Sequence, residues 1–494
     1  MRHPLMTMVL WTILLNKIMM YIRNEDTICA PATVPGTGAI SVIRITGPEA
    51  LAIADKVITC SKGKICDSKG YTMKFGIVKS ASGDVLDEVV ASIFRAPRSY
   101  TGENSVEISC HASSYIVSSL MGLLYEAGAR AAEPGEFTQR AFLNGKMDLA
   151  QAEAVADVIS SQNAAAHRIA FKQMKGGFSS ELRSMRSELL ELVSLMELEL
   201  DFSEEEVEFA DRSRLDSLLV NITGHISGLI DSFRLGNAIK NGVPVAIAGA
   251  TNTGKSTLLN ALLGEDRAIV SDIHGTTRDT IEETLNIDGI LFRFIDTAGL
   301  RETTETVEKI GIERTFKKIS EASIVLGMVD ITRDPESTRD TIREILDKVD
   351  FSCQQLIILL NKTDIADTGN ALDLIDLELR LKNLESEVSG NHILPISART
   401  GSGINTLRSL LAATQRDLLA DSETTLVTNQ RHVQALTDAR TSLLRVRDGL
   451  ASGLPTDLAA QDIREAIYHI GSIVGEISTD EVLGNIFANF CIGK

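Results

Sequence analysis

Aromatic residues are scarce in this chain: Phe, Trp and Tyr together make up 4% of its 494 residues, and there is a single Trp. Basic residues are also in the minority, because 49 Lys and Arg stand against 67 Asp and Glu and give a formal net charge of −18 at pH 7. A freestanding nucleic-acid binder normally needs a basic surface to neutralise phosphates. Either nucleic acid plays no part in the function, or something other than overall charge brings it to the protein.

The six cysteines show no pairing pattern. They form neither a C-x-x-C pair nor any repeated spacing, which argues against a disulfide framework and against a zinc site. A reducing cytoplasm is therefore the expected location. The cysteines are Cys29, Cys60, Cys66, Cys110, Cys353 and Cys491.

Long hydrophobic runs are missing too, with one partial exception at the N-terminus. Residues 5–15 are apolar and follow Arg2 and His3, which superficially resembles a signal peptide. No small-x-small cleavage site follows, and the run is too short to span a bilayer. We interpret it as an upstream start codon chosen in error, with Met19 or Met20 as the true start, and keep a real anchor as the alternative. No later segment reaches membrane-spanning length, so we expect no stable membrane association.

The sequence contains enough apolar residues, 44%, for about three domains with cores of their own. Residues 24–144 follow a doubtful N-terminal extension, 1–23, and alternate short β-rich runs with Gly and Pro turns, as in an α+β domain. Residues 145–241 almost lack helix breakers, and 416–494 return to helical spacing. Between them, 242–415 show apolar strands followed by glycine loops and helices. We therefore predict an α/β unit inserted into a helical domain. The clearest strand predictions in the first domain are residues 39–45, 85–94 and 105–109.

A strand, a glycine loop and a helix open the α/β unit. The apolar run 243–248 leads into residues 249–256, which match G-x-x-x-x-G-K-S, and the helical run 257–263 follows. The glycines let backbone N–H groups cradle phosphates at a helix N-terminus, while Lys255 reaches the β- and γ-phosphates and Ser256 ligates magnesium. The predicted contacts of this loop are Asn252, Thr253, Gly254, Lys255, Ser256 and Thr257.

Three further motifs follow in the order that a GTPase requires, each at the end of a predicted strand. The Asp364 carboxylate can accept two hydrogen bonds from the guanine N–H groups, which adenine cannot supply, so we predict GTP rather than ATP. A backbone amide near Ala398 would contact the guanine carbonyl oxygen. The motif residues are Asp296, Thr297, Ala298 and Gly299 after strand 292–295, Asn361, Lys362, Thr363 and Asp364 after strand 356–360, and Ser397, Ala398 and Arg399 after strand 392–396.

The residue after the D-x-x-G motif is Leu300, where Ras-type enzymes have a glutamine that orients the attacking water. Other groups must therefore orient water and supply positive charge. Asn252 offers a carbonyl oxygen to a monovalent cation such as potassium, but it can equally hydrogen-bond within the loop, and the residues alone leave both readings open. Water can be held by Glu302, Glu305 or Glu308, with a solvated helix face as the alternative for each.

From residue 26 to residue 494 the chain resembles the MnmE (TrmE) family of tRNA-modification GTPases. The resemblance implies an N-terminal domain that binds tetrahydrofolate and dimerises, a helical domain built from two segments, and an inserted Ras-like P-loop G domain. The motifs that carry it are D-T-I-C-A-P-A-T at 26–33, P-G-T-G-A-I at 35–40, V-I-R-I-T-G at 42–47, S-Y-T-G-E-N at 99–104, P-G-E-F-T-Q-R-A-F-L-N-G-K-M-D-L-A-Q-A-E-A at 134–154, D-T-A-G-L-R-E at 296–302 and the terminal C-I-G-K.

The resemblance also implies a function. A homodimer would act with the flavoprotein MnmG, in a heterotetramer-type complex that holds tRNA, to install a carboxymethylaminomethyl (or aminomethyl) group on carbon 5 of the wobble uridine. The one-carbon donor would be 5-formyl- or methylene-tetrahydrofolate. One alternative is a nucleotide-switched ribosome-assembly GTPase without modification chemistry, which predicts an appended basic module. Another reads C-I-G-K as a prenylation box, but Gly493 is not aliphatic.

Carried over position by position, the resemblance assigns roles that the residues alone leave open. It selects Glu308 as the residue that orients the attacking water, so that Glu308 and Lys255 are the two catalytic candidates. Cys491 matches the C-terminal cysteine of the family, for which a redox role is proposed. One departure stands at 111–113, where His-Ala-Ser replaces the usual His-Gly-Gly and puts the local geometry in question. The implied contacts are Arg44, Glu107, Lys146 and Lys494 to folate; Asn252, Ser271, Ile273 and Thr276 to potassium; Ser256 and Thr277 to magnesium; and Ser271, Asp272, Ile273, His274, Gly275, Thr276 and Thr277 to the nucleotide.

Overall fold

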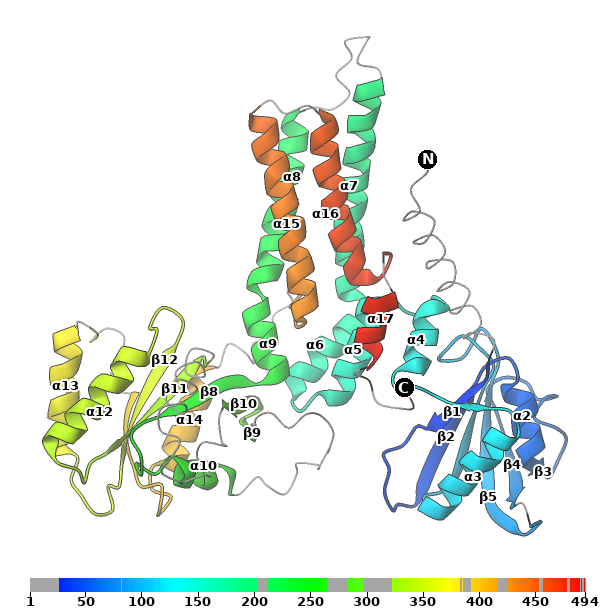
Figure 1. The fold of residues 1–494 in the computed structure, drawn as a ribbon, viewed down its shortest axis with the longest axis horizontal. Helices are drawn as coiled ribbons and strands as arrows, with labels where there is room; N and C mark the ends of the chain where they lie inside the picture. The colour runs from blue at the N-terminus through cyan, green and yellow to red at the C-terminus, as the bar shows by residue number, and fades with distance from the viewer. Residues whose placement is uncertain are drawn as a thin grey trace, which may run out of the picture. The chain divides into compact units, whose positions relative to one another are not determined.

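The computed structural model forms two compact units (Figure 1), the first made of residues 1–159, 171–223 and 435–494 and the second of 160–170 and 224–434. The domain bounds expected from the sequence remain a prediction. The residues that the structure describes are 26–80, 82–201, 212–264, 283–295, 322–382, 384, 392–415, 425–452, 456–477, 480–488, 490 and 493.

The first unit contains a seven-stranded sheet in the order β3-β4-β5-β6-β2-β1-β7. Neighbouring strands are antiparallel, except that β1 and β7 run parallel. Strand β5 has the predicted bounds, β2 is shifted by one residue toward the C-terminus, and β6 extends two residues beyond its prediction. The strands are β1 (Ile28–Pro31), β2 (Ile40–Thr46), β3 (Ile58–Cys60), β4 (Thr72–Lys79), β5 (Val85–Phe94), β6 (Ser105–His111) and β7 (Arg130–Ala131).

Helices α2 (Ala50–Val57) and α3 (Ser114–Glu126) cover one face of this sheet (Figure 1). Leu51 and Leu120 pack there against alternate strand residues such as Ile108. Side chains on the opposite face point the other way, because successive residues of a strand alternate between faces. On β4 that face bears exposed apolar residues, including Met73 at 69% and Phe75 at 48% exposed, whereas at β1 it is covered by Phe137, which packs against Ile28 and Ala30.

The helical region combines two segments that lie far apart in the sequence (Figure 1). Helix α7 packs along α16, and the ion pair between Arg464 and Glu197 joins them. Arg445 of α15 pairs with Glu465 of α16, while Arg447 lies 3.7 Å from Asp216 of α8. The helices are α4 (Glu136–Leu143), α5 (Leu149–Ser160), α6 (Ala164–Met174), α7 (Gly177–Asp201), α8 (Arg212–Asp231), α9 (Phe233–Asn241), α15 (Gln430–Ala451), α16 (Thr456–Val474) and α17 (Asp480–Ala488).

Apolar spacing explains why the long helices form. Leu189, Leu192, Val193 and Met196 recur at helical intervals, and all four are buried on α7. The predicted helical domain from two segments is confirmed. None of the described helices is both long and apolar enough to cross a membrane.

The second unit contains a six-stranded sheet in the order β13-β12-β11-β8-β10-β9, parallel except for the antiparallel pair β9 and β10. The predicted inserted α/β unit is thereby confirmed, and β8 has the predicted bounds. The elements are β8 (Val243–Ala248), α10 (Lys255–Leu263), β9 (Glu283–Ile287), β10 (Ile290–Ile295), β11 (Ile324–Asp330), α12 (Pro335–Lys348), β12 (Gln355–Asn361), α13 (Gly369–Lys382), β13 (Ile393–Ile396) and α14 (Ile404–Thr414).

Both faces of this second sheet are covered. Val245 and Leu326 pack into a core cluster that includes residues of α10 and α14, whereas their neighbours Ala246 and Val325 pack into a cluster with residues of α12 and α13. Strands buried on both faces read as continuous apolar runs, as β11 does with all seven residues buried. This burial fixes the carboxyl ends of the strands, where the predicted motifs begin.

Candidate functional site

Three of the sequence motifs meet at one edge of the parallel sheet. The glycine loop leaves β8, Asn361 closes β12, and Ser397 follows β13. Parallel strands bring their carboxyl ends to the same edge, which is where open α/β sheets bind ligands. The topology therefore assembles a single site from segments that are spread over more than a hundred residues of the sequence.

The loop between β8 and α10 wraps around the start of the helix. Gly254, the residue before α10, has φ +100, and a Cβ at this position would lie 2.5 Å from Nδ2 of Asn361. Glycine is required here for both reasons. Asn252 has φ +64, which is uncommon for a residue with a side chain. The N–H groups at the start of α10 have no partner within the helix, so the loop is suited to bind an anion.

Lys255 is directed into this loop. Its Nζ donates to the carbonyl oxygens of Gly249 and Ala250, both at 2.8 Å. Burial lowers the pKa of Lys255, and nearby Arg333 contributes in the same direction. A cation held against neutral carbonyls can exchange them for phosphate oxygens, which interact more strongly with it.

Asn361 connects the phosphate side of the site with the loop after β13. Its Nδ2 donates to the carbonyl oxygen of Thr253 at 2.7 Å, and its Oδ1 accepts from the backbone N–H of Ala398 at 3.0 Å. The side chain is buried, at 3% exposed, so both bonds are shielded from water. Asn361 thereby fixes the relative position of two motifs that the sequence predicts to touch the same ligand.

Asp364 and Ser397 form the other end of the site. Ser397 Oγ donates to Asp364 Oδ1 at 2.8 Å, and Thr363 Oγ1 donates to the carbonyl oxygen of Ile396 at 3.0 Å. These bonds orient the Asp364 carboxylate, which can still accept hydrogen bonds from a ligand with paired N–H donors. Arg399 is exposed at the rim.

Asp330, at the end of β11, was missed by the sequence analysis. It is 4% exposed, and its Oδ2 lies 2.6 Å from Nζ of Lys362. Burial would raise the pKa of Asp330, but hydrogen bonds from Lys362 and Thr332 outweigh it, so the pKa lies below its usual value. A charged residue closing a fully apolar strand run is the pattern that could have identified it.

Several predicted site residues lie outside the part of the chain that the structure describes, so their roles stay predictions. They are Ser271, Asp272, Ile273, His274, Gly275, Thr276, Thr277, Asp296, Thr297, Ala298, Gly299, Glu308, Cys491 and Lys494.

In the first unit, two of the predicted folate contacts touch each other. Arg44 on β2 and Glu107 on β6 face each other in the sheet register, and Nε and Nη2 of Arg44 each lie 2.9 Å from Glu107 Oε1. The guanidinium lies 5.2 Å from the ring centre of Tyr100 and 5.6 Å from that of Phe137. Nη1 of Arg44 also lies 3.5 Å from the carbonyl oxygen of Gly493, the residue before Lys494.

Lys146, the third described folate candidate, is exposed, and its Nζ donates to the carbonyl oxygen of Pro97 at 3.1 Å. Lys146 and Arg44 therefore contact different groups, Pro97 and Glu107. Neither Ala112 nor Ser113 is among the described residues with positive φ. The replacement of the two family glycines therefore requires no unusual backbone at these positions.

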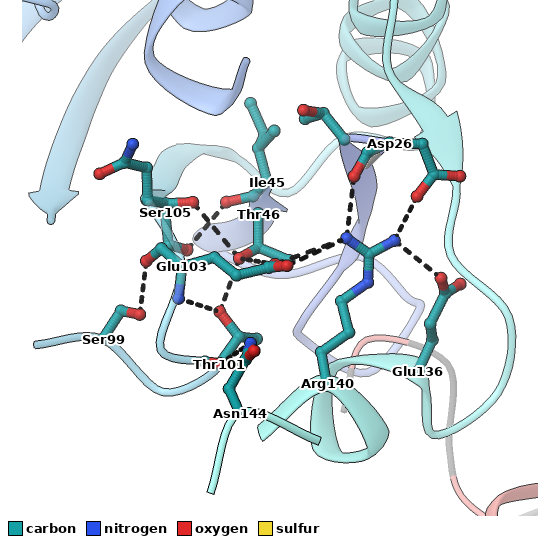
Figure 2. A network of polar contacts seen from close by, with 12 residues as sticks. Asp26, Ile45, Thr46, Ser99, Thr101, Glu103, Ser105, Glu136, Arg140 and Asn144 are labelled. Atoms are coloured by element: carbon teal, nitrogen blue, oxygen red, sulfur yellow. Dashed lines mark hydrogen bonds and ion pairs between the residues drawn. The ribbon is translucent and has the colours of Figure 1, made fainter. Parts of the chain in front are cut away.

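A buried arginine contacts Glu103 (Figure 2), which belongs to the same loop as Tyr100. Arg140 is 2% exposed; its Nη2 donates to Glu136 Oε1 at 3.0 Å, and its Nη1 lies 3.4 Å from Glu103 Oε2. Arg140 also pairs with Asp26. Thr46 and Thr101 hydroxyls, 2.7 Å apart, close the other side of the same network.

The fold and the first site define a class: a P-loop domain whose base-side motifs are those of guanine-nucleotide-binding proteins. Family models match two parts of the chain, one described as "MnmE helical domain" over residues 149–491 and one as "GTP-binding protein TrmE N-terminus" over residues 27–146. The chain is 53% identical to a tRNA modification GTPase MnmE of Bacteroides thetaiotaomicron, over 95% of this chain and 100% of the relative. It therefore belongs to the MnmE (TrmE) family of tRNA modification GTPases.

A second relative agrees with this assignment. The corresponding protein of Parabacteroides distasonis is 50% identical, again over 95% of this chain and 100% of the relative. Among solved structures, Aquifex aeolicus Era bound to GDP.AlF4- is 28% identical, over 41% of this chain and 66% of that chain, with a TM-score of 0.26.

Proposed function

We propose that this protein is a potassium-dependent GTPase that acts with the flavoprotein MnmG to add a carboxymethylaminomethyl group to carbon 5 of the wobble uridine of certain tRNAs. A tetrahydrofolate derivative, 5-formyl- or methylene-tetrahydrofolate, supplies the one-carbon unit. The convergence of the Lys255 loop, Asn361 and Asp364 at one sheet edge is the observation that carries the GTPase part of the proposal.

The residues at the phosphate side fit the two proposed metal ions. Ser256 is the second residue of α10 and offers a hydroxyl oxygen, the kind of ligand that magnesium takes together with phosphate oxygens. Asn252 offers a carbonyl oxygen on the loop before α10, which suits potassium. Potassium bound there would supply the positive charge that an arginine supplies in other GTPases. Ser271, Ile273 and Thr276 complete the proposed potassium ligands, and Thr277 the magnesium ligands.

Different side chains of this protein then have separate roles in nucleotide binding and hydrolysis. Lys255 neutralises phosphate charge, Asp364 selects guanine, and Glu308 orients the attacking water, since Leu300 cannot. Arg44, Glu107, Lys146 and Lys494 take the folate. Glu107 fits the amino edge of the pterin, and Lys146 and Lys494 fit the carboxylates of the folate, because charge-assisted bonds of this kind are short and strong. Arg44 touches Glu107 and holds its carboxylate in place.

The acidic balance of the chain supports a partnership. Because each chain carries a net charge of −18, a homodimer of this protein has little phosphate-binding capacity of its own. A heterotetramer-type complex with MnmG in the cytoplasm lets the partner supply most contacts to tRNA. Tight, salt-sensitive binding of tRNA by the isolated protein would contradict this part of the proposal.

Mass spectrometry of wobble uridines tests the proposal as a whole. Cells that lack the protein should lose the aminomethyl-type modification, and the intact gene should restore it. An unchanged modification together with defective ribosome assembly would favour the alternative, a ribosome-assembly GTPase.

The potassium role has a sharper test at Asn252. Asn252→Gly keeps the left-handed backbone accessible and removes the carbonyl oxygen, whereas Asn252→Asp keeps an oxygen at the same place. GTP hydrolysis by the wild-type protein should be faster in potassium than in sodium. Asn252→Gly should lose this difference and Asn252→Asp should keep part of it; equal wild-type rates in both salts would refute the role.

A further inference from the structure

Two residues of the nucleotide site have an uncommon backbone. Asn252 in the phosphate-binding loop has φ +64, and Lys362 in the base-side loop has φ +75. Residues other than glycine adopt such angles at a cost, and only where the surroundings hold them. The surroundings of both residues lead to the end of β11.

Lys362 is held by Asp330. Its Nζ lies 2.6 Å from Asp330 Oδ2. The other oxygen of the carboxylate, Oδ1, accepts from the backbone N–H of Thr332 at 3.0 Å and from the Thr332 hydroxyl at 2.6 Å. Because Thr332 fixes the carboxylate and burial shields it, Asp330 gives Lys362 a rigid ionic partner.

Asn252 is held by Arg333, which follows Asp330 by three residues. Arg333 Nη2 donates to the carbonyl oxygen of Thr251, so it fixes the peptide that directly precedes Asn252. Arg333 Nε lies 3.7 Å from Asp330 Oδ2, the same oxygen that faces Lys362. One carboxylate oxygen thus lies between the cation that supports the phosphate-binding loop and the cation that belongs to the base-side loop.

We propose that Asp330 and Arg333 are positioning residues that hold the phosphate-binding loop and the base-side loop in their binding conformations together. Asp330 acts on both loops, and Arg333 acts on the phosphate-binding loop alone. This inference rests on the GTP binding of the proposed function and adds to it a physical link between recognition of the base and recognition of the phosphates. Neither residue belongs to the G-x-x-x-x-G-K-S or N-K-x-D motifs.

Competition titrations with GMP and GDP against a fluorescent guanine nucleotide test the inference on the full chain. Asp330→Asn keeps the shape of the side chain but removes the charge, and should raise the Kd of both nucleotides about tenfold. Arg333→Gln should raise the Kd of GDP about fivefold and that of GMP less, because the phosphate-binding loop chiefly contacts the phosphates beyond the first. Asp334→Asn is the matched control, since Asp334 caps α12 in the same loop and Asn also serves as a cap.

The double variant separates positioning from a general loss of stability. If Arg333 works together with Asp330, adding Arg333→Gln to Asp330→Asn should raise the Kd of GDP less than it does in the wild-type background. Fully additive effects, or wild-type affinities in both single variants, would overturn the inference. Arg333 is a third exposed, so its variant tests the inference even if Asp330→Asn does not fold. Failure of the wild-type protein to bind GDP would instead refute the proposed function.

Discussion

The two sheets of this protein place their polar residues by different means. In the six-stranded parallel sheet, Asn361, Asp330 and Ser397 each stand at the end of a strand or directly after one, so the topology brings them to one edge. In the seven-stranded antiparallel sheet, Arg44 and Glu107 lie within strands and meet through register. Most of the site at the strand ends is marked in the sequence by motifs, although Asp330 is not. The contact between Arg44 and Glu107 follows from register, which no motif spells out.

The two regions also differ in how charge is buried. The edge of the parallel sheet buries one carboxylate, that of Asp330, beside the partly exposed cations Lys362 and Arg333. The first unit instead concentrates charge around Arg140, which faces three carboxylates. Removing one partner from a buried cluster is costly because the others stay behind unpaired. Substitutions around Arg140 in the first unit should therefore lower the stability of the fold, whereas substitutions at the edge of the parallel sheet should lower the affinity for the ligand.

The largest effect is expected from Arg140→Met. This change removes the cation that faces Glu103 and one of the two that face Asp26 and Glu136, since Arg130 remains, and should lower the free energy of unfolding by about 3–5 kcal/mol. Chemical denaturation, with hydrogen exchange of the β1 amides as a local probe, measures the loss. Arg183→Met is the control, because Arg183 is half exposed and, among the described residues, pairs with the single carboxylate of Asp148, which keeps its bonds from Gln151 and Ser179. A loss below about 1 kcal/mol, or a concurrent loss of GTP binding, would erase the distinction between the regions.

The second-largest effect is expected from Asp364→Asn, which should change the affinity for GTP rather than the stability of the fold. The amide replaces an acceptor with a donor, so GTP binding should weaken about 100-fold, or about 2.7 kcal/mol, and preference should shift toward xanthosine triphosphate. Titration with both nucleotides measures the change. Asp367→Asn, an exposed position in the same loop, should leave both affinities unchanged. Unaltered GTP affinity in Asp364→Asn would remove Asp364 from the site.

Acid should weaken the first unit through Asp26 and Glu136. Burial tends to raise the pKa of both carboxyls, but bonds from Arg130 and Arg140 outweigh it and hold the pKa values below the ordinary 3.8 and 4.5. The stability they contribute is therefore complete above those values and is lost as the pH falls through the lower folded-state values.

The pKa of Glu103 is shifted in the opposite direction from those of Asp26 and Glu136. Burial raises the pKa of Glu103 above its ordinary 4.5, so its contribution is fully present below 4.5 and is lost as the pH rises through the folded-state value. Denaturation across the acid range should show a shallower acid loss in Glu136→Gln and a steeper one in Glu103→Gln than in the wild-type protein. The same pH profile in both variants would contradict the opposite directions of the pKa shifts of Glu136 and Glu103.

The smallest effect is expected at the register pair itself. Arg44 and Glu107 are partly exposed, so a double-mutant cycle with Arg44→Met and Glu107→Gln should give a coupling energy of about 1 kcal/mol or less. Binding of 5-formyl-tetrahydrofolate, measured on the same variants, should fall more than stability does. A coupling energy of several kcal/mol would assign the pair to the framework of the sheet rather than to a ligand site.

Much of the fold was predictable because the patterns are local. The apolar runs of β5 and β8 have the bounds that the sequence predicts, since turn residues and glycine loops stop them sharply. The motif after β8 could be located because glycine is the only residue that tolerates both the φ of Gly254 and the close approach of Asn361. The roles of Asp330 and Arg333 could not be predicted, because their partners belong to other strand ends and share no spacing with them.

Local chemistry along the chain was enough to determine the α/β unit and the order of its motifs and to predict a guanine-specific role for Asp364, because each depends on residues adjacent in the sequence. Only the tertiary structure decided that Arg44 faces Glu107, that Arg140 is buried among carboxylates and that Asp330 stands between two loops. These arrangements depend on strand register and on the packing of distant segments. Register follows from pairing across the whole sheet, which no local window of the sequence contains.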